Sequence, residues 1–166
     1  MSKPLINCSY GALEKTDSLK PHPRNPNTHT ERQIELLAKI IKHQGWRNCI
    51  VVSKRSGLIV AGHGRLLAAK KLGLKEVPVD WQQFKNVKDE LSYLVADNRI
   101  AEIAEINRAT LAEIIGDIDS GDFDLELTGF ELSNIEELMT ASPPLDLGEN
   151  NNDENQRCPK CGEVLL

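Results

Sequence analysis

The residues best suited to chemistry lie in one short stretch, Gly62-His63-Gly64-Arg65. An apolar run over 58–61 precedes it, and the good helix formers of 65–72 follow it and end at Gly73. This pattern predicts a turn between a strand and a helix, where the first helical N–H groups have no partner within the helix. Those amides, two glycines that admit close approach, and the Arg65 guanidinium together predict a binding site for phosphate or another anion.

Each residue of this stretch also has a simpler explanation. Glycines before a helix are common in α/β proteins for turn geometry alone. Arg65 could be a solvated arginine, but a cation in the first turn costs about 0.3–1 kcal/mol against the helix dipole, which favours a bound anion. His63 could contact the phosphate through a ring N–H, or act as a proton donor near pH 7. We favour contact over catalysis for His63.

A basic loop is the second candidate part of the site. Three prolines within residues 21–26 exclude a helix and the interior of a sheet, and the same loop carries Lys20, His22 and Arg24. These side chains are either a solvated basic surface or a wall that closes over an anion held at Gly62.

The elements that must position these residues follow from the hydrophobic pattern. Helices are predicted from a capping box at Thr30 to Gly45, over 89–105, over 110–118, and over 133–139 with Ser133 as N-cap. Strands are predicted at 10–13, 49–52, 58–61 and 76–81. The helix after Thr30 has one apolar face and is expected to cover a sheet. Pro78 predicts an edge position or a bulge for its strand.

The helix over 89–105 carries a stripe that is expected to face inward, formed by Leu91, Leu94, Val95, Asn98, Ala101 and Glu102. Asn98 is either an amide with a partner in the core or a residue that faces a polar site, because burying it unpaired costs about 1–3 kcal/mol. Further on, the apolar residues of 123–130 predict an extended connection. We find no helix-turn-helix signature there.

The C-terminal part of the chain has a different composition. Residues 141–156 are polar and acidic, which predicts a disordered linker. Cys158 and Cys161 then have the spacing of half a zinc knuckle within 157–166, since thiolates two residues apart can reach one tetrahedral ion. Further ligands would come from Cys8 or Cys49, from a second copy, or from nowhere. A redox pair is less favoured because no strand precedes the cysteines and no helix follows them.

Length and composition set broad limits. A chain of 166 residues, 40% hydrophobic and 27% charged, allows one soluble domain of α/β (α+β) class plus a tail. The net charge of −5 argues against DNA binding by a bulk positive field, so any DNA contact needs a local patch. Since we find neither a membrane-spanning run nor a signal-peptide core, we expect a cytoplasmic location and no membrane partner.

Four stretches in order resemble the ParB/sulfiredoxin superfamily, above all the ParB-like domain fused to phage and prophage DNA adenine methyltransferases. They are residues 19–26, 60–69, 96–102 and 123–130. The resemblance implies a mixed sheet with flanking helices over 1–140 and a nucleotide pocket bordered by the basic loop. It also implies that Asp97 and Asn98 hold Mg²⁺ on the nucleotide phosphates, for which hard oxygen ligands are suitable.

The chain departs from these relatives at several positions. His63 stands where sulfiredoxins have their catalytic cysteine, so thiol chemistry is not expected. ParB partition proteins have Gly-Glu-Arg-Arg in place of the stretch at Gly62, and an arginine in place of Ala101, so neither cytidine specificity nor hydrolysis follows for this chain. No Asp-Pro-Pro-Tyr type sequence is present, so the chain is not itself an adenine methyltransferase.

Three hypotheses about function follow. The first is a nucleotide- or phosphate-binding module in phage or mobile-element DNA transactions, in a bacterial or phage-infected host cell, with DNA, a separate methyltransferase or a second copy as partners. The second is an Mg²⁺-dependent phosphoryl-transfer enzyme, namely an NTP hydrolase, kinase or nuclease, with His63 or Asp97 as acid or base. The third is a zinc-knuckle adaptor without catalysis.

Overall fold

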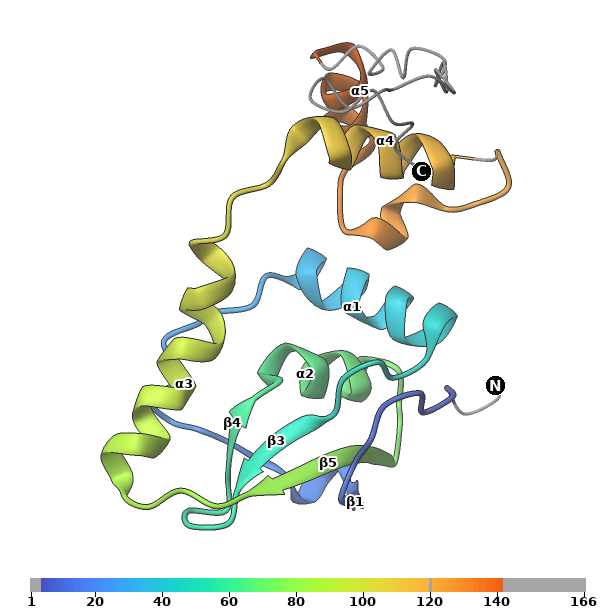
Figure 1. The fold of residues 1–166 in the computed structure, drawn as a ribbon. Helices are drawn as coiled ribbons and strands as arrows, with labels where there is room; N and C mark the ends of the chain where they lie inside the picture. The colour runs from blue at the N-terminus through green and yellow to red at the C-terminus, as the bar shows by residue number, and fades with distance from the viewer. Residues whose placement is uncertain (1–3, 120, 142–166) are drawn as a thin grey trace, which may run out of the picture.

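A five-stranded mixed sheet forms the base of the computed structural model, which describes residues 4–119 and 121–141 (Figure 1). The strand order is β1-β5-β3-β4-β2. The strands are β1 (Ala12–Lys15), β2 (Lys20–Pro21), β3 (Ile50–Ser53), β4 (Leu58–Ala61) and β5 (Glu76–Gln82). The helices are α1 (Glu31–Gln44), α2 (His63–Lys71), α3 (Val87–Glu102), α4 (Arg108–Ile118) and α5 (Leu132–Ala141), with single turns η1 (Thr16–Ser18) and η2 (Leu125–Thr128). The α/β class and the mixed sheet are confirmed.

Strand β5 lies inside the sheet, between β1 and β3. The prediction of an edge or a bulge at Pro78 is therefore wrong. The parallel ladder to β3 begins at Val79, one residue after Pro78, so the missing proline N–H removes no bond of that ladder. On the other side Pro78 lies opposite Leu13 of the short strand β1.

Helix α2 lies on one face of the sheet, and α1 lies over α2 (Figure 1). Ala68 and Ala69 of α2 are fully buried, and their small side chains let the helix approach its neighbours closely. Helix α1 was expected to cover the sheet directly, but it packs mainly against α2. Its predicted start is confirmed, because the Thr30 side chain accepts a hydrogen bond from the Gln33 N–H.

Helix α3 packs beside β4 on the opposite face, where Phe84 and Tyr93 cover Val51 and Val60. The inward stripe of α3 differs from the predicted one. Glu90 and Leu94 are buried, whereas Val95 is 52% exposed. A buried glutamate shifts the inward face of the helix, and a search for apolar periodicity does not detect it.

The last helices form a small second core around Ala112, Ile115, Ile135 and Leu138. Ion pairs join Lys39 of α1 to Asp124 and Glu126 at the surface between this part and the rest of the molecule. The expected extended connection contains the turn η2, and α5 begins at Leu132, so Ser133 lies inside the helix and is not its N-cap. None of the helices among the described residues is long and apolar enough to cross a membrane. Cys158, Cys161 and the linker predicted over 141–156, except Ala141 at its start, lie outside the described residues.

Candidate anion-binding site at the start of helix α2

The turn predicted at Gly62 is present. Gly62 is the N-cap of α2 with a φ of 91°, in the left-handed region, and its carbonyl accepts the first helical hydrogen bond from Leu66 at 3.0 Å. A glycine adopts this conformation without the steric cost of a Cβ. A Cβ at this position would also lie 3.0 Å from Nη2 of Arg65. The guanidinium therefore folds back over the turn and lies beside the first free N–H groups of the helix.

Arg65 is half-buried and makes no ion pair among the described residues. Its Nε is buried and has no hydrogen-bond partner in the described part of the chain. Burial lowers the pKa of Arg65, and the nearby Asp97 carboxylate acts in the opposite direction. A desolvated guanidinium without a carboxylate partner is suited to pairing with a bound anion.

His63 begins α2, and its ring Nε2 accepts a hydrogen bond from the main-chain N–H of His22 at 3.2 Å. Burial, with smaller effects from His29 and His22, lowers the pKa of His63 to about 4. The ring is therefore neutral at pH 7, and since Nε2 accepts, we assign the proton to Nδ1. This differs from the proton donor considered from the sequence and leaves His63 a structural contact with one ring N–H.

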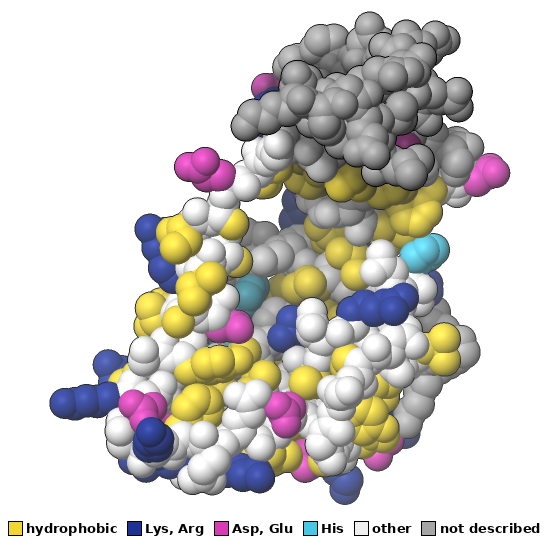
Figure 2. All heavy atoms as spheres, in the orientation of Figure 1, with side chains coloured by type: hydrophobic (Ala, Val, Ile, Leu, Met, Phe, Trp, Pro, Cys, Tyr) yellow, Lys and Arg dark blue, Asp and Glu magenta, His cyan; other side chains and the backbone are white. Residues whose placement is uncertain are grey.

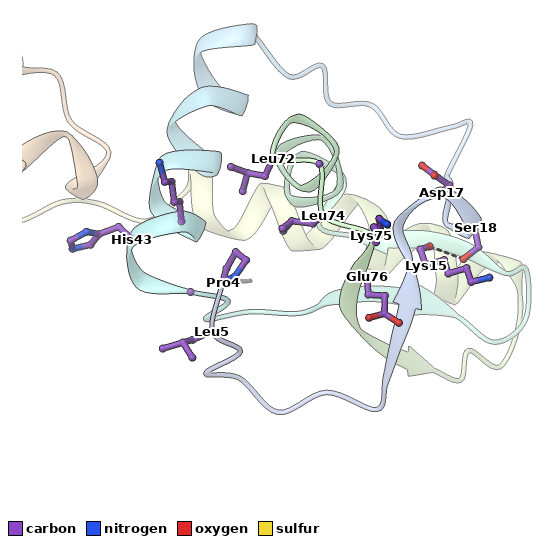
Figure 3. A pocket seen from close by; sticks show the side chains of 13 residues that line it. Pro4, Leu5, Lys15, Asp17, Ser18, His43, Leu72, Leu74, Lys75 and Glu76 are labelled. Atoms are coloured by element: carbon purple, nitrogen blue, oxygen red, sulfur yellow. Dashed lines mark hydrogen bonds between the residues drawn. The ribbon is translucent and has the colours of Figure 1, made fainter. Parts of the chain in front are cut away.

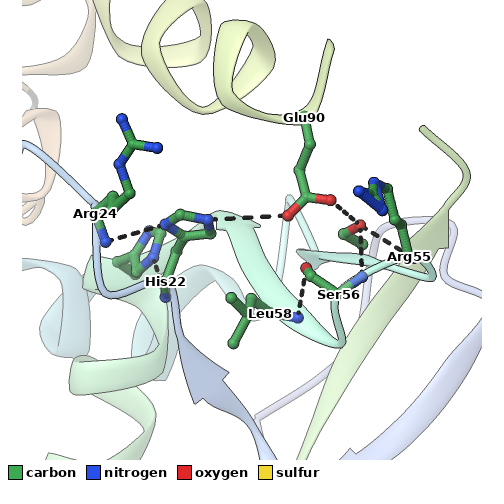
Figure 4. A network of polar contacts seen from close by, with 8 residues as sticks. His22, Arg24, Arg55, Ser56, Leu58 and Glu90 are labelled. Carbon is green, nitrogen blue, oxygen red and sulfur yellow. Dashed lines mark hydrogen bonds and ion pairs between the residues drawn. The ribbon is translucent and has the colours of Figure 1, made fainter. Parts of the chain in front are cut away.

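The structure separates the three basic residues of the loop. His22 is buried next to His63, and its Nδ1 accepts from the Arg24 N–H at 3.1 Å. Arg24 is exposed, and its side chain points away from His22 (Figure 4). Lys20 is exposed and pairs with Leu58, four residues before Gly62. At about 3.3 Å per strand residue, Lys20 lies about 13 Å from the turn.

A buried polar network behind the turn was missed by sequence reasoning (Figure 4). Glu90 Oε1 lies 3.9 Å from His22 Nε2, and Oε2 accepts a hydrogen bond from Ser53 Oγ at 2.8 Å. The Ser53 hydroxyl also accepts from the N–H groups of Arg55 and Ser56. The network joins the β3–β4 hairpin, the basic loop and α3, so it fixes α3 relative to the turn.

The predicted magnesium ligands lie on α3. Asp97 is exposed, and its charge opposes the lowering of the Arg65 pKa by burial, so Asp97 lies on the side of α3 toward the turn. It shares this side with Glu90 and Leu94 at helical spacing. Asn98 is half-buried, and its amide donates to the Leu94 carbonyl at 3.2 Å. Asp97 therefore offers a carboxylate that makes no ion pair among the described residues, and Asn98 offers its amide oxygen.

The ParB N-terminal domain model matches residues 13–98, slightly more than half of the chain. The chain belongs to this family. It is also 41% identical over 61 residues to the ParB-like nuclease domain-containing protein YnaK of Escherichia coli K12, which covers 37% of this chain and 69% of YnaK. The ParB chromosome-partitioning protein of Caulobacter crescentus, solved with CTP-γ-S, has the same fold, with a TM-score of 0.59 and 24% identity over 78% of this chain and 77% of that one.

A second family model, the ParB-methyltransferase HTH domain, matches residues 109–163. This corrects the sequence analysis, which found no helix-turn-helix signature. Helices α4 and α5 are joined by a long segment that contains η2, not by the short turn of three or four residues that identifies the motif.

The part of the HTH-matched segment that the structure describes is strongly acidic. Residues 109–141 contain no Lys or Arg. Their acidic residues are Glu113, Asp117, Asp119, Asp122, Asp124, Glu126, Glu131, Glu136 and Glu137. DNA affinity rests largely on basic contacts to phosphates, and residues 109–141 offer no Lys or Arg for such contacts.

Two hollows of this ParB-like chain lie away from the turn. The larger, about 1360 Å³, lies at the opposite end of α2 from Gly62 (Figure 3). Its lining comes from the segment 72–76 after α2, the end of α1 and the N-terminal segment. The smaller, about 530 Å³, lies between Arg55 and the start of α3. The space-filling view shows a further depression between α3 and α1, bordered by basic, acidic and histidine side chains (Figure 2).

Proposed function

We propose that the chain is a ParB-type module that binds a nucleotide through its phosphates at the start of α2. The observation that carries this proposal is the position of two unpaired atoms. Among the described residues, the buried side-chain nitrogens without a hydrogen-bond partner are Arg65 Nε and His29 Nε2. Both side chains lie beside the Gly62–Gly64 turn, where a Cβ on Gly62 or Gly64 would meet them. Leaving such groups unpaired costs about 1–3 kcal/mol each, and a ligand at the turn would remove this cost.

A nucleotide is the ligand class that the comparisons favour. The Caulobacter ParB that shares this fold was solved with CTP-γ-S. In the present chain the free N–H groups of the first turn of α2 and the Arg65 guanidinium would hold the phosphates. His63 would position the turn through its bond to His22. Arg24 would close the site from the basic loop, and Lys20 would act at longer range.

Magnesium would enter this site with the nucleotide. Among the described residues no group of three His, Cys, Asp or Glu side chains is placed to hold a metal ion. Mg²⁺ bound by one or two side chains and by substrate phosphates needs no such group. Asp97 would be its charged ligand, and the side-chain oxygen of Asn98 would be the second.

DNA, a separate methyltransferase and a second copy of the chain are proposed partners, in phage or mobile-element DNA transactions. The match to the ParB-methyltransferase HTH domain supports a role near DNA. The acidic residues 109–141 favour a protein partner over direct phosphate contacts for that segment. Zinc at Cys158 and Cys161 stays a prediction, and both cysteines lie within the matched range.

A second candidate function is phosphodiester hydrolysis, which the name of the relative YnaK favours. Asp97 would then hold the catalytic metal, and His63 would be the remaining acid or base candidate. The neutral His63 ring with its occupied Nε2 favours binding over this reaction. Loss of Mg²⁺-dependent cleavage in Asp97→Asn would support the hydrolase.

The test is thermal unfolding of the full chain with a panel of nucleoside mono-, di- and triphosphates, with and without Mg²⁺. A ligand at a hundred times its Kd should raise the free energy of unfolding by about 2.7 kcal/mol. Stabilisation by at least one nucleotide, lost in Arg65→Ala, is the expected result. No stabilisation by any of them would contradict the proposed function.

A further inference from the structure

His29, which no sequence motif identifies, lies against the Gly62–Gly64 turn. It sits in the segment that leads into α1, and a Cβ built on Gly64 would come within 3.2 Å of its Cε1 and 3.3 Å of its Nδ1. A glycine at position 64 therefore leaves room for this imidazole beside the first turn of α2. His29 is also close enough to His63 to contribute to the lowered pKa of His63.

The hydrogen bonds of the His29 ring leave one nitrogen without a partner. Nδ1 lies 3.0 Å from Oε1 of Gln33, and because an amide oxygen only accepts, Nδ1 carries a proton. Nε2 is buried and has no hydrogen-bond partner within residues 4–119 and 121–141. In the neutral imidazole only one of the two ring nitrogens carries a proton, and here it is Nδ1. Nε2 is therefore a bare acceptor.

A bare acceptor requires a donor, and a phosphate ionised at neutral pH is a poor one. The donor must come from another part of the ligand, close to the phosphate because His29 touches the same turn. In a nucleotide this group is a ribose hydroxyl. We infer that His29 Nε2 accepts a hydrogen bond from a ribose hydroxyl of the nucleotide whose phosphates lie on the Gly62 turn. This inference rests on the proposed function and adds discrimination between ribose and deoxyribose.

The experiment is calorimetric titration of the full chain with the best triphosphate of the panel and with its 2′-deoxy and 3′-deoxy analogues. One hydrogen bond is worth about 0.5–1.5 kcal/mol, so the chain should bind the ribonucleotide about 3- to 10-fold more tightly than at least one analogue. His29→Ala should lower the affinity for the ribonucleotide to that for the analogue, and it should leave the affinity for the analogue unchanged. His29→Gln, which retains an acceptor, should restore part of the preference.

His43→Ala is the matched control, because His43 is exposed at the other end of α1 and should leave the preference unchanged. Equal affinity of the unaltered chain for all three nucleotides would overturn the inference, and this comparison needs no variant. Equal weakening of all three in His29→Ala would also overturn it, because packing alone has that effect. Failure of the unaltered chain to bind any of the three nucleotides would contradict the proposed function itself. Equal binding of all three would contradict only the inference about His29.

Discussion

The main-chain N–H of His22 donates to ring Nε2 of His63 at 3.2 Å. The two residues are 41 positions apart, and the bond attaches the basic loop to the first residue of α2. It requires a neutral His63 ring with a free lone pair on Nε2. The conformation of the Gly62–Gly64 turn therefore depends on the protonation of the His63 ring.

The first prediction concerns pH. The pKa of His63 is lowered from 6.5 to about 4 in the folded chain, so between these values the unfolded chain binds the proton more readily. The stability that His63 contributes is present above pH 6.5 and is lost as the pH falls toward 4. After allowance for screening by solvent, the loss should be about 1–2 kcal/mol.

The measurement is the free energy of unfolding by urea across pH 4 to 8, for the unaltered chain and for His63→Gln. Glutamine keeps an acceptor and does not titrate, so the difference between the two curves isolates His63 from the carboxylates. Parallel curves between pH 6.5 and 4 would show that His63 is not buried as a neutral ring.

The second prediction concerns the buried network. Ser53→Ala removes the donor to Glu90 and leaves the N–H groups of Arg55 and Ser56 without their acceptor. The free energy of unfolding, measured in urea, should fall by about 1–3 kcal/mol. Ser56→Ala is the matched control, because that hydroxyl is at an exposed position and should change stability by less than about 0.5 kcal/mol. Equal effects of the two substitutions would mean that Glu90 is solvated.

The third prediction compares two glycines within helices. A Cβ at Gly64 would lie 2.9 Å from Leu37 Cδ1 and 3.2 Å from His29 Cε1, so Gly64→Ala should destabilise the chain by about 1–3 kcal/mol. Gly116 is exposed in α4, and among the described residues a Cβ there would meet Met139 Cε, in ordinary contact at 3.9 Å. Gly116→Ala should therefore stabilise by about 0.5–1 kcal/mol. Thermal unfolding of both variants gives the signs, and a stable Gly64→Ala would contradict the close contact with His29.

The fourth prediction concerns the acidic segment. Without basic side chains, residues 109–141 should not be protected by duplex DNA in hydrogen exchange at physiological salt. Replacing Glu136 and Glu137 by lysine should increase DNA binding and make the slope of log K against log salt steeper by up to about 2. Strong protection of α4 and α5 by DNA in the unaltered chain would refute the electrostatic argument.

The local parts of this site could be predicted from sequence. The turn at Gly62 and the start of α1 at Thr30 depend on residues within a few positions of each other, so their signals survive in one sequence. The pairing of Glu90 with Ser53 and His22 joins residues far apart in the chain, and a polar residue on an inward face looks like an error in the pattern. His29 has no local signal, because only the fold brings its ring to Gly64.

Pro78 and the helix-turn-helix segment are two of the predictions that tertiary context reversed. Pro78 is tolerated inside the sheet because the ladder to β3 starts after it. The long connection between α4 and α5 hides the helix-turn-helix relationship, which the match to a family model reveals.

Arg65 is the residue on which the account depends most, and the most direct measurement is the affinity of Arg65→Ala for the nucleotide that stabilises the unaltered chain. Arg99→Ala is the control, because Arg99 is exposed on α3 and pairs with Glu102. A hydrogen bond to a charged group is worth about 1.5–3 kcal/mol, so calorimetry should show binding about 10- to 150-fold weaker in Arg65→Ala and unchanged in Arg99→Ala. Equal affinity of Arg65→Ala and the unaltered chain would contradict the central claim that this guanidinium and the Gly62 turn hold the anion.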